Sequence, residues 1–364
     1  MLLSSSGDHV LGTTVMTDGA NYAALPDALR AHHDMLAAAA AEGHAVALYP
    51  PSASSIRTQG SGLSAVDAAA VGTFQARGFV VIDDAFDEEA VSGALGALDD
   101  ICAGHNASFA AAAAVFDAAA QVADLYGSDV ALKKAAHRAT LLQREATGAA
   151  RVRKVQGMVV HDDRIESIAN DAALRSAVRA LLGGREGDEV YLLQDTALIK
   201  GPGGREKPWH QDQAYFDVHN DVAVCGVWIA LDPATVENGC MFLLPAAHRT
   251  AEGAPAPISH FQRRDWQICD EFLLRGKGEA CSDGREADVS AEGGGAAARA
   301  QCAVLRPGGV LFFDGLAPHG TPTNTSAQRR RALQLHFVLA DRLRWCGKGA
   351  RLSDFSGAQH GATC

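Results

Sequence analysis

Residues of the types that bind transition metals occur at three positions in the second half of the chain: His210, Asp212 and His319. Two imidazoles and one carboxylate are the ligand set of non-haem Fe(II) sites, which leave other positions on the metal open. Arg330 follows His319 by eleven residues. A guanidinium is always charged and binds a carboxylate through two parallel hydrogen bonds, so Arg330 is a candidate partner for the far carboxylate of a keto-acid cosubstrate.

The His-x-Asp pattern alone is not specific. With 14 His and 43 acidic residues among 364, chance gives roughly 1.7 His-x-Asp/Glu triplets. Four with Asp occur, and they begin at His32, His161, His210 and His219. For the triplets other than the one at His210, an Ala-rich helix, a surface turn and a loop are the simpler interpretations.

The surroundings of His210 favour it as a ligand. It follows a candidate strand at 189–200 and a Gly/Pro-rich turn, and a second apolar run at 222–231 comes after it. In an extended segment, residues i and i+2 lie on the same side, so His210 and Asp212 can reach one metal ion. In a helix the same two positions diverge by about 200° and cannot share an ion.

The segment around His319 predicts three further strands. Residues 301–306 and 309–315 read as short strands joined by a Pro-Gly turn, and His319 follows the second of them. After a polar loop, residues 331–340 read as another strand. Both predicted metal-binding segments are therefore expected to lie on a sheet.

Three consecutive arginines precede this last strand, Arg329 to Arg331, and a solvated basic turn is the simpler interpretation. Alternation favours Arg330 as the functional one. It shares a face with Ala332, Gln334 and His336, whereas its two neighbours share the opposite, bulkier face. The more polar face is the one that a cavity wall with a buried charge would require.

Composition limits the class of protein. An apolar content of 48% is enough for a core, and the length allows one large or two ordinary domains. The net charge is −11 and no basic cluster besides Arg329–Arg331 is evident, so we expect no nucleic-acid partner. No run of 18 apolar residues predicts a membrane span. The sequence does not indicate an oligomeric state.

The eight cysteines show no C-x-x-C pair and no disulfide-framework spacing, which suits a reducing, intracellular compartment. The start of the chain does not resemble a secretory signal, and its last residues, 361–364, are not a Ser-Lys-Leu peroxisomal address. The cytosol is the default expectation, with the peroxisome or another organelle left open.

The chain divides into three parts. Residues 1–65 form an Ala/Ser/Gly-rich appended arm with a helical stretch at 25–42, residues 66–345 form the main domain, and residues 346–364 form a tail. An insertion at 251–300 interrupts the main domain, and its Gly/Ala/Glu-rich part, 276–298, is expected to be a loop near the site entrance.

Three helices are expected in the first half of the main domain. The first runs from Asp87, its N-cap, to Gly104, and an amphipathic helix is expected at 163–182. Residues 107–147 are Ala-rich and read as helical. Their basic residues form either a solvated face or part of a surface that binds an anionic substrate such as a CoA thioester.

Four further motifs occur in the chain: Phe74-Gln75-Ala76-Arg77-Gly78-Phe79-Val80-Val81, Trp209-His210-Gln211-Asp212 with Tyr215-Phe216, Asn238-Gly239-Cys240 with Leu243-Leu244-Pro245 and His248, and His319-Gly320 with Arg330 and His336-Phe337. Together these segments resemble the phytanoyl-CoA dioxygenase family of Fe(II)/2-oxoglutarate oxygenases, over about residues 70–342. Ala246-Ala247 departs from the usual Gly-Thr or Gly-Ser of the third segment.

The resemblance implies an α+β fold with a double-stranded β-helix core, the cupin-like jelly roll, flanked by α-helices. It also implies roles for individual residues. Iron would be held by His210, Asp212 and His319; the distal carboxylate of 2-oxoglutarate would be bound by Arg330 with Thr321; and further cosubstrate contacts would come from Lys154, Gln211 and Trp228.

The activity implied is that of a dioxygenase that uses Fe(II), 2-oxoglutarate and O2, with ascorbate as a supporting reductant, to hydroxylate an aliphatic C–H bond. A branched fatty acyl-CoA is the first candidate substrate, and a small or secondary metabolite is the alternative. Two other classes remain: a non-catalytic cupin that binds metal, and an isomerase or zinc hydrolase with the same three ligands. Arg330 at this spacing has no use in the latter.

Overall fold

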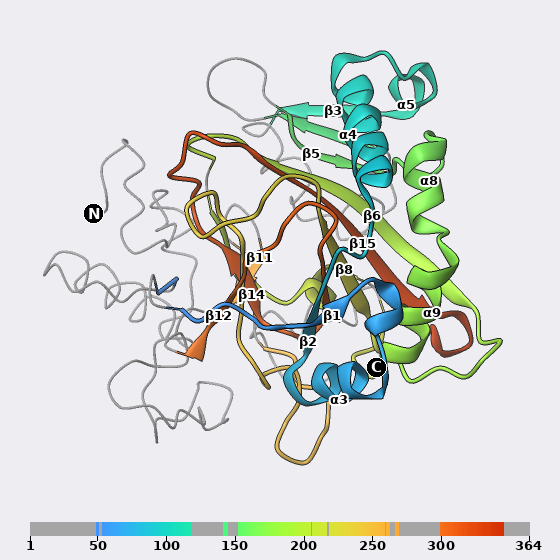
Figure 1. Cartoon of the computed structure of the whole chain (residues 1–364), viewed down its shortest axis with the longest axis vertical. Helices are drawn as coiled ribbons and strands as arrows, with labels where there is room; N and C mark the ends of the chain where they lie inside the picture. The colour runs from blue at the N-terminus through green and yellow to red at the C-terminus, as the bar shows by residue number, and fades with distance from the viewer. Residues whose placement is uncertain are drawn as a thin grey trace, which may run out of the picture.

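The computed structural model describes residues 49–50, 53–117, 141–144, 152–204, 206–216, 218–258, 260–262, 266–268 and 299–345. Within these ranges the strands form a nine-stranded sheet, a four-stranded sheet and a separate pair (Figure 1). In the order of pairing, the larger sheet contains β1 (Thr58–Ser61), β2 (Phe79–Asp83), β13 (Val310–Asp314), β8 (Cys225–Ala230), β15 (Arg330–Leu339), β6 (Val190–Lys200), β5 (Val152–Gln156), β4 (Leu141–Arg144) and β3 (Ala114–Asp117). The smaller sheet contains β12 (Gln301–Ala303), β9 (Met241–Leu243), β14 (His319–Thr321) and β7 (Lys207–His210), and the pair is β10 (His260–Gln262) with β11 (Trp266–Ile268).

The two faces of the larger sheet pack against different partners. Alternate residues of a strand point to opposite faces, and in β13 Phe312 belongs to one apolar cluster whereas Leu311 and Phe313 belong to another. The Phe312 cluster includes helix residues such as Val178, and the other includes Phe242 of β9. The larger sheet thus has a helix-covered outer face and an inner face turned toward the smaller sheet, as the jelly-roll prediction requires.

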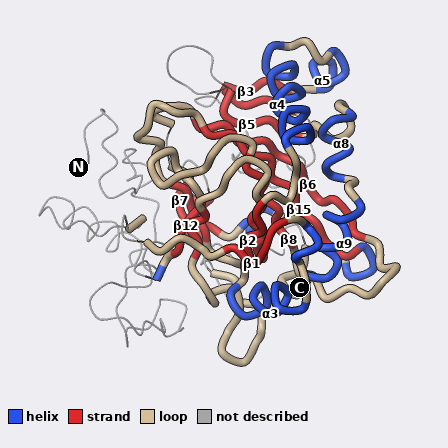
Figure 2. The backbone as a smooth tube through the Cα atoms, in the orientation of Figure 1, coloured by secondary structure: helices blue, strands red, loops and turns tan. Residues whose placement is uncertain are grey.

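The helices that cover the outer face are α3 (Ala68–Arg77), α4 (Glu88–Ala103), α5 (Ala107–Ala112), α8 (Asp163–Ala169) and α9 (Ala172–Leu181). Figure 2 shows α4, α5, α8 and α9 on the side of the strands opposite β7 and β12, and α3 below β1 and β2. The predicted helix from Asp87 to Gly104 is confirmed: the Asp87 carboxylate accepts a hydrogen bond from the Ala90 N–H, and Gly104 ends the helix in a left-handed conformation.

Two predicted helices were wrong in extent. The helix expected at 163–182 is divided into α8 and α9, because Asn170 ends the first and the side chain of Asp171 caps the second by accepting from the Leu174 N–H. Of the helix expected at 107–147, the described residues contain only the short helix α5 at its start, and residues 114–117 and 141–144 form β3 and β4 instead. Alanine content indicates helix only weakly, and pairing with β5 decides the structure of β4.

The two strands expected on either side of Pro307-Gly308 are present, but they lie in different sheets: β12 pairs with β9, and β13 pairs with β2 and β8. Gly308 has a positive φ of 82°, and a Cβ there would lie 2.1 Å from the carbonyl oxygen of Phe86. Glycine is therefore required where the chain crosses between the sheets.

The predicted arm, 1–65, contributes β1, which pairs in parallel with β2. The helix expected at 25–42, the loop at 276–298 and the tail at 346–364 lie outside the described residues. In the part of the chain that the structure describes, no helix combines the length and apolar character needed to cross a bilayer.

Candidate active site

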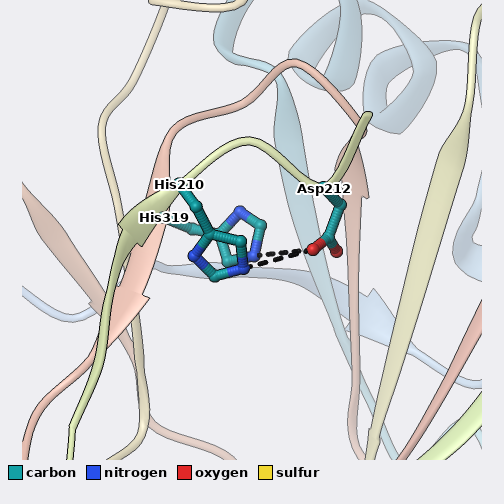
Figure 3. A group of neighbouring side chains, drawn as sticks. All are labelled: His210, Asp212 and His319. Carbon is teal, nitrogen blue, oxygen red and sulfur yellow. Dashed lines mark ion pairs between the residues drawn. The ribbon is translucent and has the colours of Figure 1, made fainter. Parts of the chain in front are cut away.

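Strand pairing in the smaller sheet brings the two histidines together. His319 of β14 lies directly opposite His210 of β7 in an antiparallel register, and the centroids of their rings are 4.2 Å apart. Figure 3 shows both imidazoles directed toward the carboxylate of Asp212, whose Oδ1 is 3.2 Å from Nε2 of His210 and 3.6 Å from Nε2 of His319. The predicted set of two imidazoles and one carboxylate is therefore assembled in space.

The backbone between His210 and Asp212 is extended at Gln211, as the alternation argument required, and the 3-10 turn η3 (Asp212–Tyr215) begins immediately afterwards. The second oxygen of Asp212, Oδ2, accepts hydrogen bonds from β15: Nε2 of Gln334 is 2.7 Å away and Nε2 of His336 is 2.8 Å away. One carboxylate oxygen thus faces the imidazoles, while two buried side chains hold the other.

The protonation states at this site fit a cation. The Nδ1 of His319 lies 3.0 Å from the carbonyl oxygen of Ala317, so it is the protonated nitrogen, and Nε2 keeps its lone pair. Burial, reinforced by repulsion from His210, lowers the pKa of His319 to about 3. Burial alone would raise the pKa of Asp212, but the neighbouring imidazoles of His319 and His336 outweigh it and hold that pKa well below its usual range.

The ligand atoms of His210, Asp212 and His319 lie within 4.8 Å of one another, and all three residues are buried. Among the described residues this is the only such group of three or more metal-binding side chains. Two imidazoles beside an ionised carboxylate suit a divalent transition metal, and the one-sided arrangement is the one that Fe(II) oxygenase sites use. The residues present therefore fit an iron ion.

Arg330 is buried, with 2% of its surface exposed. Its Nη2 donates to the carbonyl oxygen of Gly239 at 3.0 Å, and its guanidinium carbon lies 5.3 Å from the ring centroid of Trp228. Its Nε and Nη1 have no hydrogen-bond partner, nor does Nε1 of Trp228. Buried N–H groups of this kind are normally satisfied, so these donors fit an anionic ligand.

The other two arginines of the run do not compete for this role. Arg331 points to the opposite face, where its Nε lies 2.8 Å from Asp232 and its Nη1 lies 3.3 Å from Asp99. Arg329 is exposed. The structure thus places the guanidinium of Arg330, and neither of its neighbours, on the inner face, as alternation predicts.

A lysine that the sequence analysis overlooked lies beside Arg330. Lys200, at the end of β6, is directly opposite Arg330 in the β6–β15 register and is also buried. Its Nζ donates to Oγ1 of Thr321 at 2.7 Å. Burial, together with the charge of Arg330, lowers the pKa of Lys200 well below its usual value.

The predicted Asn-Gly-Cys segment shapes this pocket. Gly239 has a positive φ of 85°, and a Cβ there would lie 2.7 Å from the carbonyl oxygen of Pro322 and 2.9 Å from Cδ of Lys200. Asn238 holds the turn, since its side chain accepts from the Thr235 N–H at 2.8 Å. Only glycine at 239 lets the backbone carbonyl approach Arg330 this closely.

The cosubstrate contacts predicted for Gln211 and Lys154 have less support than the one predicted for Arg330. The side-chain amide of Gln211 donates to the carbonyl oxygens of Ala256 and Leu316, and its Oε1 accepts from the Ile258 N–H. As the residue between two ligands on an extended segment, Gln211 points away from them. Lys154 lies on β5 opposite Leu198, two residues from Lys200 on the same face of the sheet. Both contacts stay predictions.

Three residues of the site escaped the sequence analysis: Lys200, and Gln334 and His336 as partners of Asp212. The alternation of side chains along β15 places Gln334 and His336 on the same face as Arg330, so the sequence held a usable signal for them. Lys200 could have been found only from the register of β6 with β15, because a lysine before a Gly-Pro turn otherwise reads as solvated.

The remaining His-x-Asp triplets do not form sites in the described part of the chain. His161 lies in the turn before α8, and its Nδ1 is 2.8 Å from Oγ of Ser108. His219 lies in a loop, and its backbone N–H donates to the carbonyl oxygen of Arg344. The triplet at His32 lies outside the described residues.

A jelly roll that holds a buried His/Asp/His group at the edge of its inner face defines a class of metal-binding double-stranded β-helix proteins. Within that class the chain belongs to the phytanoyl-CoA dioxygenase family, whose model matches residues 74–332. The resemblance inferred from the sequence motifs and the predicted fold are thereby confirmed.

The similarity to individual relatives covers less of the chain than the family match does, at sequence identities below 30%. Methylphosphonate hydroxylase of Gimesia maris is 28% identical over 155 residues, which are 43% of this chain and 48% of that protein. The peroxisomal phytanoyl-CoA dioxygenase of Homo sapiens is 26% identical over 160 residues, 43% of this chain and 41% of that protein. The chain spans about half the length of the curated relatives it matches.

Among solved structures, EvdO2 from Micromonospora carbonacea var. aurantiaca superimposes with a TM-score of 0.50 at 20% identity, over 79% of this chain and 96% of that one. At this level of identity the likeness concerns the fold.

Proposed function

We propose that this chain is an Fe(II)- and 2-oxoglutarate-dependent dioxygenase that hydroxylates an aliphatic C–H bond. The observation that carries the proposal is the combination of the buried His210–Asp212–His319 group with a buried guanidinium, Arg330, two of whose nitrogens have no hydrogen-bond partner. Such a guanidinium would be costly to bury in a protein that bound only a metal ion. The combination therefore favours an enzyme with an anionic cosubstrate over a non-catalytic cupin.

The spacing along β14 supports 2-oxoglutarate as the cosubstrate. Thr321 follows His319 by two residues and lies on the same face of the strand, about 7 Å along it. A five-carbon dicarboxylate can span this separation, with its keto-acid end at the metal and its distal carboxylate between Thr321 and Arg330. Trp228 would form the wall beside that carboxylate.

His210, Asp212 and His319 would hold the iron. When iron, 2-oxoglutarate and O2 are bound, the metal centre supplies the oxidising power that hydroxylates an unactivated C–H bond. The protein contributes orientation: Gln334 and His336 hold the outer oxygen of Asp212, and the burial of the ligands keeps bulk water away.

For the substrate we propose a branched fatty acyl-CoA, which the family match and the motif spacings support. A small metabolite is the second candidate, because methylphosphonate hydroxylase is among the relatives at 28% identity. A fold does not determine a substrate, so the choice between the two rests on assay.

The test is a coupled assay of purified protein with Fe(II), ascorbate, 2-oxoglutarate and O2. Phytanoyl-CoA and methylphosphonate are offered separately, and succinate and hydroxylated product are measured by mass spectrometry. We expect product with one of them in equal amount to succinate, and none from the His210→Ala variant. Product formed equally by His210→Ala would refute the site, and succinate without product would refute both substrates.

We also propose a reducing compartment, with the cytosol as the first candidate. The cysteines at the described positions, Cys102, Cys225, Cys240 and Cys302, are all free thiols, which is the state that such a compartment maintains. Fractionation of cells followed by detection with an antibody to the protein would test the cytosolic assignment, and recovery of the protein with peroxisomes would contradict that assignment.

A further inference from the structure

The pairing of β6 with β15 sets two cations against each other. Lys200 and Arg330 lie directly opposite in the register, with 8% and 2% of their surfaces exposed. Like charges directly opposite on a sheet repel, and burial removes the water that would screen them. The buried carboxylate of Glu206 opposes the lowering of the Lys200 pKa and so favours the charged amine, and an anionic ligand beside Arg330 would stabilise the pair further.

The hydrogen bonds of Lys200 show how it would serve that anion. Its Nζ donates to the carbonyl oxygen of Thr321 at 3.3 Å, to Oγ1 of Thr321 at 2.7 Å and to the carbonyl oxygen of Pro322 at 2.5 Å. These three acceptors match the three donors of an ammonium group. Lys200 is thus held at Thr321 and has no donor left for a ligand.

The bond to Oγ1 directs the hydroxyl proton of Thr321. Because this oxygen accepts from Lys200, its own proton must point elsewhere, and none of the described residues accepts it. Nε and Nη1 of Arg330 and Nε1 of Trp228 are likewise without partners. Four donor atoms from three strands, three nitrogens and one oxygen, are therefore without an acceptor in one buried region.

We propose that Lys200 is a positioning residue for the distal carboxylate of 2-oxoglutarate. It supplies the second positive charge and turns the hydroxyl of Thr321 toward the carboxylate that Arg330 binds. The inference rests on the proposed function, since it takes 2-oxoglutarate as the cosubstrate, and it adds Lys200 to the residues that select a dicarboxylate.

The competing account is that Lys200 only fastens β6 to the loop at 321–322. That role would make Lys200 important for stability, and a variant would unfold more easily. It would not make the protein distinguish a ligand with a distal carboxylate from one without. Both accounts therefore predict that Lys200 variants are less stable, but only the proposal predicts that they discriminate less between the two kinds of ligand.

The experiment compares 2-oxoglutarate with 2-oxopentanoate, which has a methyl group in place of the distal carboxylate. Dissociation constants are measured by calorimetry on the full chain loaded with Mn(II), for the wild type, Lys200→Met and Lys200→Gln. Arg329→Met is the matched control, because it removes one cation from the exposed position next to Arg330. Arg330→Met and thermal unfolding of every variant are measured alongside.

We expect the wild type to prefer 2-oxoglutarate, and Lys200→Met to reduce this preference about tenfold or more, with little change in Mn(II) affinity. Arg329→Met should keep it. Lys200→Gln retains a hydrogen-bond donor without the charge, so its preference for 2-oxoglutarate should lie between those of the wild type and Lys200→Met. This variant also provides the test if Lys200→Met fails to fold.

An unchanged preference in both Lys200 variants, with the preference lost in Arg330→Met, would overturn the role of Lys200 and leave the proposed function intact. A wild type that binds both ligands equally would overturn the proposed function, and the role of Lys200 with it.

The dependence on Thr321 gives a second arm. If Lys200 acts through the hydroxyl, Thr321→Val and Lys200→Met should lower the affinity for 2-oxoglutarate by less in combination than the product of their separate effects. Independent, multiplicative losses would contradict the coupling.

Discussion

At the scale of single residues, the site depends on how Asp212 uses its two oxygens. Oδ1 faces the imidazoles of His210 and His319, whereas Oδ2 is fixed by Gln334 and His336. A carboxylate held this way cannot rotate freely, so the position of its ligand oxygen is set before any metal arrives. Hydrogen-bond partners of a metal ligand are usually almost as important for metal affinity as the ligand itself.

Replacing Gln334 by Leu should therefore weaken metal binding. The change removes a 2.7 Å hydrogen bond to Asp212 while keeping similar bulk, and we expect Mn(II) affinity to fall by about 10- to 100-fold. Titration followed by electron paramagnetic resonance measures it. Gln328→Leu, at an exposed position before β15, is the control. Equal affinity in wild type and Gln334→Leu would show that Asp212 is positioned without this bond.

The residue chemistry could be predicted from the sequence to a large extent. Residue types that bind metals identify His210, Asp212 and His319, and the alternation of side chains along β15 identifies Arg330. Both signals are local in the sequence. Lys200 could not be found this way, because its role depends on its register with Arg330 on a strand 130 residues away. Long-range pairing is not contained in local pattern.

At the scale of elements, close packing between β8 and β13 supports the site. Gly226 of β8 pairs with Phe313 of β13, and a Cβ at 226 would lie 2.3 Å from the phenyl ring. That ring in turn lies 4.9 Å from the imidazole of His319, centroid to centroid. The glycine leaves the space in which Phe313 backs the metal ligand.

Gly226→Ala should consequently overpack the core. We expect a loss of about 1–3 kcal/mol in the free energy of unfolding, measured with urea, together with weaker metal binding as Phe313 is displaced. Gly72→Ala is the control: this residue lies in α3 with nothing within 4 Å of an added Cβ, so the change should stabilise by about 0.5–1 kcal/mol. A neutral effect of Gly226→Ala would mean that Phe313 moves aside without cost.

The start of α8 gives a prediction about pH. Asp162 caps this helix and pairs with Arg164 at 2.8 Å, and chiefly this hydrogen bond lowers the pKa of Asp162 against the opposing effect of burial. A lowered folded-state pKa contributes stability that is present above the unfolded-state value of about 3.9 and is lost as the pH falls through the folded-state value.

Asp162→Asn should therefore reduce the free energy of unfolding by about 1 kcal/mol at pH 7, since Arg164 is partly exposed and the pair is screened. The gap to the wild type should narrow below about pH 4. Asp163→Asn removes the same charge from an exposed neighbouring position and should change stability less. A gap independent of pH would assign the effect to packing.

Elements were predictable where local signals were strong and less so elsewhere. The caps Asp87 and Gly104 mark α4 correctly. Within the Ala-rich segment at 107–147, the described residues 114–117 and 141–144 are strands, because sheet pairing outweighs intrinsic helix preference. The amphipathic helix expected at 163–182 is two helices, because Asn170 ends the first and Asp171 caps the second.

At the scale of the whole molecule, the site joins parts that are far apart in sequence. β7 and β14 of the smaller sheet carry the histidines, and β15 and β6 of the larger sheet carry the groups that hold Asp212 and the cosubstrate pocket. A ligand that bridges these parts binds the folded state only, and it should stabilise the molecule as a unit.

Loading with Mn(II) should raise the thermal unfolding temperature. At a metal concentration about a hundredfold above the dissociation constant, the stabilisation is about 2.7 kcal/mol. The shift should disappear with EDTA and in His319→Ala, and differential scanning calorimetry measures it. A shift of the same size in His319→Ala would place the metal elsewhere in the chain.

The most direct test of the central claim is an anaerobic titration of the metal-free protein with Fe(II) and then 2-oxoglutarate, followed in the visible region. The account predicts a weak metal-to-ligand charge-transfer band that requires both additions, is absent in His319→Ala and needs far more 2-oxoglutarate in Arg330→Met. Iron binding without this band would contradict the cosubstrate assignment and make a non-oxygenase cupin the better description.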